Sequence, residues 1–129
     1  MLALCDWRAE SPPESHVRVH IRKSGLPRPI PQYVVESGGY QIARVDFGWP
    51  KLRFAAEYDG QWHADRAQLA DDRDRIKALQ RAGWHVHPVT NRDLRNVPRM
   101  LAELGAALSR RATELGVPLG RSHLRSGRQ

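Results

Sequence analysis

The 129-residue chain carries a formal net charge of +7, has a pI of about 10.5 and is 40% hydrophobic, a composition that excludes global disorder and suits one packed domain. Its single cysteine, Cys5, excludes an internal disulfide framework and a multi-cysteine zinc site, and it fits a reducing cytoplasm. No apolar run is long enough for a signal peptide or a bilayer-spanning helix, so we expect a cytoplasmic protein with no membrane partner.

The N-terminal half predicts a helix followed by three strands. Ser11 suits a helix N-cap, and Glu14 follows at the capping-box spacing. Residues 30–59 then predict a three-stranded antiparallel meander, in which Gly38-Gly39 forms the first turn.

The C-terminal half predicts a helix, a short strand and a second helix. The stretch ADRAQLADDRDRIKALQRAG has the apolar spacing of an amphipathic helix, with a stripe formed by Leu69, Ile76 and Leu79. WHVHPV predicts the strand. The last helix is expected to start at the N-cap Asn96 and to end at Gly116.

The resulting order α-β-β-β-α-β-α predicts an α/β (α+β) fold, a mixed sheet with helices packed against it. We expect a lead-in over residues 1–10, one domain over 11–116 and a basic, disordered tail over 117–129.

Acidic side chains interrupt the apolar runs of the second and third strands. Side chains two residues apart share a face of a strand, so Glu57 and Asp59 are expected to point the same way. On the second strand, Asp46 is expected on the face opposite to Val45 and Phe47. Folding of the hairpin brings Asp46 opposite or diagonal to Glu57, at roughly 5–8 Å between Cβ atoms.

Like charges at this range repel, so the sequence predicts a compensating cation, an arginine or a protonated acid beside Asp46 and Glu57. Carboxylates are hard ligands for Mg²⁺ or Mn²⁺, which can activate water for phosphodiester hydrolysis. The basic composition would hold a polyanion such as DNA nearby. The structural alternative is that Asp46 ends a strand, Glu57 faces solvent and Asp59 belongs to a turn.

Four further residues are candidates for the same cluster. His63 follows the third strand and could transfer protons or position water, although a lone surface histidine is common. Glu14 is either the capping-box partner of Ser11 or an outer metal ligand. Asp72 and Arg75 stand one helical turn apart and could form a supporting ion pair.

The segment ARVDFGWPKLRFAAEYDGQWH, followed by DDRDRIKALQRAGWHV, resembles a bacterial family of uncharacterised domains related to very-short-patch repair endonucleases, within the restriction-endonuclease-like PD-(D/E)xK superfamily. SPPES near the start and Gln32 match as well, and the likeness covers roughly residues 10 to 95. The resemblance implies an endonuclease fold, metal-dependent hydrolysis and a DNA substrate. It also implies Asp46 and Glu57 as metal ligands, Glu14 as an accessory ligand and His63 as the proton-transfer residue.

Asp59 stands where the superfamily usually has a lysine that helps to orient the attacking water. Two functions therefore stay open: an endonuclease or nicking enzyme in which Asp59 joins the catalytic site, and a nucleic-acid-binding module that keeps the fold without cutting. A protein-interaction or antitoxin-like component is a third. Relatives often carry an N-terminal DNA-binding segment that this sequence does not show, so we expect a stand-alone or shortened form. A homodimer and a separate DNA-binding partner are both compatible with it.

Overall fold

The computed structural model describes residues 12–59 and 66–119, and a four-stranded sheet lies at their centre. The strands follow each other in the order β1-β2-β3-β4. β1, β2 and β3 are antiparallel neighbours, which confirms the predicted meander, whereas β4 runs parallel to β3. Their bounds are β1 Ile30–Ser37, β2 Tyr40–Trp49, β3 Phe54–Tyr58 and β4 His85–Val89.

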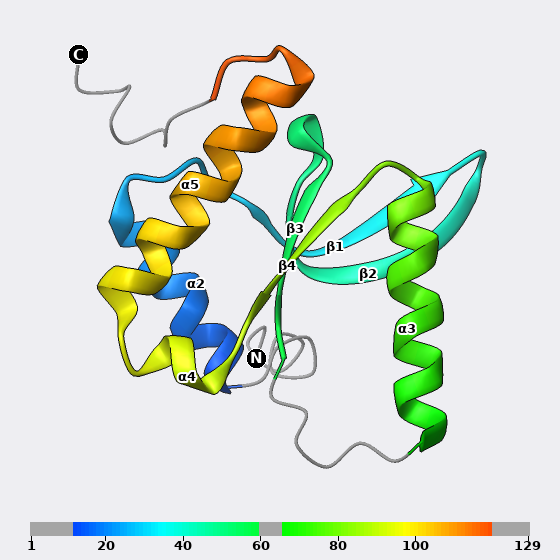
Figure 1. The fold of residues 1–129 in the computed structure, drawn as a ribbon, viewed down its shortest axis with the longest axis horizontal. Coiled ribbons are helices and arrows are strands. Elements are labelled where there is room, and N and C mark those ends of the chain that lie inside the picture. The colour runs from blue at the N-terminus through cyan, green and yellow to red at the C-terminus, as the bar shows by residue number, and fades with distance from the viewer. Residues whose placement is uncertain (1–11, 60–65, 120–129) are drawn as a thin grey trace, which may run out of the picture.

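The helices divide between the two faces of the sheet (Figure 1). α2 and α5 pack on one face, and α3 lies against the opposite face. The predicted order of helices and strands is confirmed, and two short elements are added to it, the 3-10 turn η1 and the helix α4. The bounds are α2 Pro12–Ser24, η1 Pro50–Leu52, α3 Arg66–Arg81, α4 Asn91–Leu94 and α5 Val97–Leu115.

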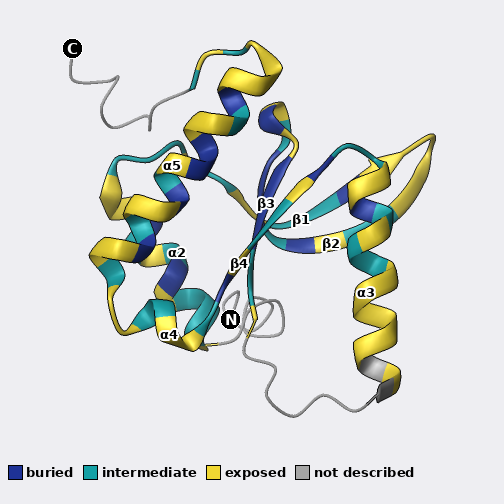
Figure 2. Ribbon diagram, in the orientation of Figure 1, coloured by how far each residue is buried: buried dark blue, intermediate teal, exposed yellow. Residues whose placement is uncertain are grey.

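Each face of the sheet has its own hydrophobic core, and the neighbouring residues Ala55 and Ala56 of β3 belong to different ones. The larger cluster packs Val17 and Ile21 of α2 and Leu104 and Leu108 of α5 against the sheet. The smaller one contains Leu79 of α3. α3 is exposed over most of its length (Figure 2).

The predicted apolar stripe of α3 is therefore wrong at one end. Leu79 is fully buried, but Leu69 is 40% exposed, because the sheet contacts only the C-terminal part of this helix. At the end of the chain, Val117 and Leu119 pack against the larger core, beyond the boundary expected at residue 116.

The strand faces also differ from the prediction at one point. Phe47 packs in the larger cluster and Val45 in the smaller one, although simple alternation puts both on one face. Gln32, which the register places level with Asp46, has a positive φ of 50°, and the two residues do not pair. Asp46 lies between Val45 and Phe47, where the side chains of β2 change from one core to the other.

None of the helices in the described ranges is long and apolar enough to cross a membrane.

Candidate active site

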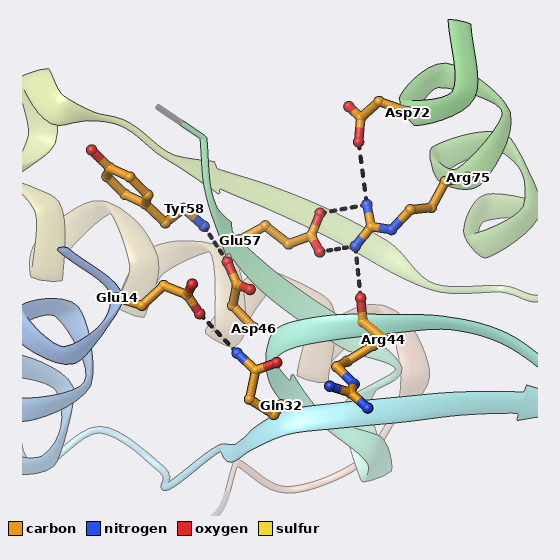
Figure 3. A network of polar contacts seen from close by, with 8 residues as sticks. All are labelled: Glu14, Gln32, Arg44, Asp46, Glu57, Tyr58, Asp72 and Arg75. Carbon is orange, nitrogen blue, oxygen red and sulfur yellow. Dashed lines mark hydrogen bonds and ion pairs between the residues drawn. The ribbon is translucent and has the colours of Figure 1, made fainter. Parts of the chain in front are cut away.

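Asp46 lies at the centre of a polar network that runs between α2 and α3 (Figure 3). The backbone N–H of Tyr58 donates to Asp46 Oδ2 at 2.8 Å, which ties β2 to the end of β3. The pKa of Asp46 is raised to about 7, mainly by burial, with contributions from the charges of Glu14 and Glu57 and a hydrogen bond to Glu14, and against the lowering effect of the Tyr58 N–H. Asp46 is thus a carboxyl group that exchanges its proton near neutral pH.

Glu14 reaches Asp46 from the first turn of α2. Its Oε2 accepts a hydrogen bond from Gln32 Nε2 at 2.8 Å, so α2 and β1 hold it from two sides. The left-handed backbone of Gln32 places this amide at the point where Asp46 lies. The predicted role of Glu14 as an accessory member of the cluster fits this geometry. Its alternative role, capping with Ser11, lies outside the described residues.

Glu57 points toward α3, away from Glu14 (Figure 3). Arg75 donates to both of its carboxylate oxygens, with Nη1 at 2.9 Å from Oε1 and Nη2 on Oε2. The Arg75 Nη2 also donates to the carbonyl oxygen of Arg44 at 2.7 Å. The predicted pair of Arg75 with Asp72 is present but loose, at 3.5 Å, and the stronger partner Glu57 was not predicted.

The sequence predicted a cation, an arginine or a protonated acid beside the crowded carboxylates, and the structure contains the second and the third. An arginine neutralises Glu57, and a raised pKa lets Asp46 keep a proton.

Asp59 directly follows β3, and its backbone N–H donates to the carbonyl oxygen of Val89 on β4 at 2.7 Å. Its exposed side chain lines a small cavity of about 100 Å³ together with Glu57 and Asp72. Asp59 thus opens toward the α3 side of the sheet, as strand parity predicted for Glu57 and Asp59. His63 lies outside the described residues, so its place in the site stays a prediction.

The donor set suits a hard divalent ion that keeps most of its water. In the described part of the chain, no three acidic, histidine or cysteine side chains gather closely enough to form a complete metal cage. Mg²⁺ does not need one, because it is commonly held by one or two carboxylates, with water and substrate phosphates completing the octahedron. The hydrogen-bonded pair Asp46 and Glu14 can supply two such ligands.

Tyr58 is a site residue that sequence reasoning missed. Its N–H holds Asp46, while its hydroxyl hydrogen-bonds to Asn91 Oδ1 at the start of α4. Its position directly before Asp59 was the only sequence signal for this double role.

Comparisons with known proteins agree with this architecture. No family model matches the chain. Two curated proteins of Mycobacterium tuberculosis, the uncharacterized proteins MT2308 and Rv2248, are each 42% identical to it over 103 residues. The match covers 79% of this chain but only 38% of each relative, so the chain spans well under half of their length.

A solved structure gives the fold. The catalytic domain of the homing endonuclease I-Bth0305I superposes with a TM-score of 0.57 at 20% sequence identity, covering 74% of this chain and 91% of that domain. The chain has an endonuclease-like fold. The predicted fold class is confirmed, while the relation to very-short-patch repair endonucleases stays a prediction.

Proposed function

We propose that this chain is a metal-dependent DNA endonuclease or nicking enzyme that hydrolyses phosphodiester bonds. The observation that carries the proposal is the position of Asp46, a partly buried carboxyl group whose pKa is raised to about 7 and which contacts a second carboxylate, Glu14. Such a crowded acidic pair in a protein of net charge +7 is costly for stability alone, and a bound divalent cation would offset the cost.

Each residue of the cluster then has a distinct role. Asp46 and Glu14 would hold Mg²⁺ or Mn²⁺, and Gln32 and the Tyr58 N–H fix the directions of their oxygens. The ion, when bound, would lower the pKa of water and stabilise charge on a phosphate. Glu57 would join these ligands only if it left Arg75, because both of its oxygens are engaged there.

The remaining roles concern proton transfer and the substrate. Asp59 is exposed at the end of β3, where it could accept a proton from water, and His63 follows it as a second candidate. DNA is the proposed partner because the chain is basic and its fold is that of an endonuclease domain.

The alternative function, a nucleic-acid-binding module that does not cut, is favoured by the Arg75–Glu57 pair. This pair removes one of the two carboxylates from metal binding, and Asp59 replaces the lysine usual in the superfamily. Titration calorimetry with Mg²⁺ and with Mn²⁺ separates the two proposals. A nuclease site requires saturable binding that is lost in Asp46→Asn and weakened in Glu14→Gln. If both ions bind equally weakly to wild type and Asp46→Asn, the metal-dependent nuclease is excluded.

A further inference from the structure

The segment after β4, residues 90–99 with the sequence TNRDLRNVPR, is held by two consecutive helix caps. Thr90 and Asp93 form a reciprocal capping box at the start of α4. Asn96 then caps α5 by accepting a hydrogen bond from the backbone N–H of Arg99 at 3.2 Å. The backbone of this segment is therefore fixed by local hydrogen bonds, and its side chains project from a defined scaffold.

Three of these side chains are exposed arginines, Arg92, Arg95 and Arg99. Within residues 12–59 and 66–119, no carboxylate forms an ion pair with any of them. The acidic residue between them, Asp93, accepts from Thr90. Arg75, by contrast, is engaged by Glu57. The segment thus presents three guanidinium groups to solvent.

This segment lies at the same edge of the sheet as the carboxylates. β3 and β4 are parallel and end together, with Tyr58 level with Val89. The Tyr58 hydroxyl bonds to Asn91, the residue before Arg92, while the N–H of the same Tyr58 bonds to Asp46. One residue of β3 therefore connects the arginine segment to the carboxylate cluster, and Figure 1 shows α4 beside the end of β3.

We propose that Arg92, Arg95 and Arg99 form the surface that grips the DNA backbone next to the phosphate to be cleaved. This inference rests on the proposed function and names its phosphate-binding residues. Guanidinium groups bind phosphate oxygens through two parallel hydrogen bonds, which fixes the position of a strand as well as its charge. Such contacts set the register of the protein on DNA and carry no base information.

A second basic surface provides a matched control. Arg22, Lys23 and Arg28 line a hollow of about 280 Å³ with Val19, and the first two stand in the last turn of α2. Glu14 stands in the first turn of the same helix, roughly 12 Å away along its axis at 1.5 Å per residue. Replacing these three cations removes as much positive charge as replacing Arg92, Arg95 and Arg99, and it leaves the proposed phosphate-binding surface intact.

The experiment measures binding of a fluorescein-labelled DNA duplex by anisotropy, in EDTA so that no strand is cut. The triple variant R92Q/R95Q/R99Q is compared with R22Q/K23Q/R28Q and with wild type over a salt series from about 50 to about 200 mM. We expect the first variant to bind at least about tenfold more weakly and to lower the slope of log K against log salt by about 2–3, since each phosphate contact contributes roughly 0.9. The control should change the slope by less than about 1.

A third variant, R92K/R95K/R99K, keeps the positive charges but loses the paired N–H donors of the guanidinium groups. It should retain most of the salt slope while binding more weakly than wild type. The side chains changed in the three variants are all exposed, so the thermal unfolding curves of the variants, measured by circular dichroism, should coincide with that of wild type.

The proposal would be overturned if R92Q/R95Q/R99Q and R22Q/K23Q/R28Q lost equal DNA affinity, or if R92Q/R95Q/R99Q lost none. This binding experiment can be decided independently of whether the protein cuts DNA. A wild type that binds through these arginines yet never cuts would overturn the nuclease proposal alone. If wild type cuts and R92Q/R95Q/R99Q cuts at the same rate, the arginine proposal alone is overturned.

Discussion

Arg75 on α3 donates to both carboxylate oxygens of Glu57 on β3 and to the carbonyl oxygen of Arg44 on β2. This one side chain joins the helix to two neighbouring strands, and it explains how Glu57 tolerates a position where its side chain is only 14% exposed. Glu57 is thus part of the scaffold that carries the site, whatever ions the site binds.

Replacement of Arg75 by Met should lower the free energy of unfolding by about 1–3 kcal/mol, because it leaves the Glu57 carboxylate partly buried without its partner. In the double variant Glu57→Gln/Arg75→Met, the loss should be smaller than the sum of the single losses by about 1 kcal/mol or more. Urea unfolding of the four proteins measures this. Asp72→Asn is the control and should change little, since its contact with Arg75 is long and exposed. Strictly additive losses would show that the Glu57–Arg75 pair does not couple.

Asp46→Asn should stabilise the protein at alkaline pH and not at acidic pH. The folded state raises the pKa of Asp46 from 3.8 to about 7, so between these values it keeps a proton that the unfolded chain has released. The stabilisation from this proton is complete below the unfolded pKa and disappears as the pH rises through the folded pKa. A shift of this size corresponds to at most about 4 kcal/mol, and solvent screening reduces this to about 2.

The measurement is urea unfolding of wild type and Asp46→Asn at pH values near 4 and near 8. Mg²⁺ added at the higher pH should stabilise wild type and leave the variant unchanged. The same difference between the two proteins at both pH values would contradict the raised pKa of Asp46.

Gly48→Ala should destabilise the protein by about 1–3 kcal/mol through overpacking. A Cβ at Gly48 would lie 2.8 Å from the Cβ of Tyr33, whose ring stacks on Trp84 at 5.7 Å and cannot easily move. Gly105→Ala is the contrast, because there the new Cβ meets only the end of the Leu26 side chain at 3.1 Å and α5 gains helix propensity. Thermal unfolding should separate the two variants, and equal melting temperatures would show that β1 and β2 do not approach as closely as described.

The elements of this fold could be predicted because their signals are local. Gly38-Gly39 marks the turn of the first hairpin, and both take positive φ there. Asn96 and Gly116 bound α5 as their cap chemistry predicts. The mixed sheet then follows from the order of the elements and their lengths.

The site was only partly predictable, because its key contacts join distant parts of the chain. Glu57 and Arg75 are 18 residues apart, and the sequence suggested only the neighbouring Asp72 as a partner. The positive φ of Gln32 has no signature, since a non-glycine residue adopts it only when tertiary contacts compensate. Strict strand alternation also failed around Asp46, since Val45 and Phe47 pack in different cores.

Metal-dependent nuclease activity is tested by conversion of supercoiled plasmid to nicked or linear DNA with Mg²⁺ and with Mn²⁺, comparing wild type, Asp46→Asn and R22Q/K23Q/R28Q. We expect wild type and the charge control R22Q/K23Q/R28Q to cut, no cutting in EDTA, and a cutting rate at least about a hundredfold lower in Asp46→Asn. Glu57→Ala, run alongside, should cut poorly through loss of the scaffold. Cutting by Asp46→Asn at the wild-type rate, or no cutting by wild type with either ion while the plasmid is bound, would contradict a metal-dependent nuclease site at Asp46.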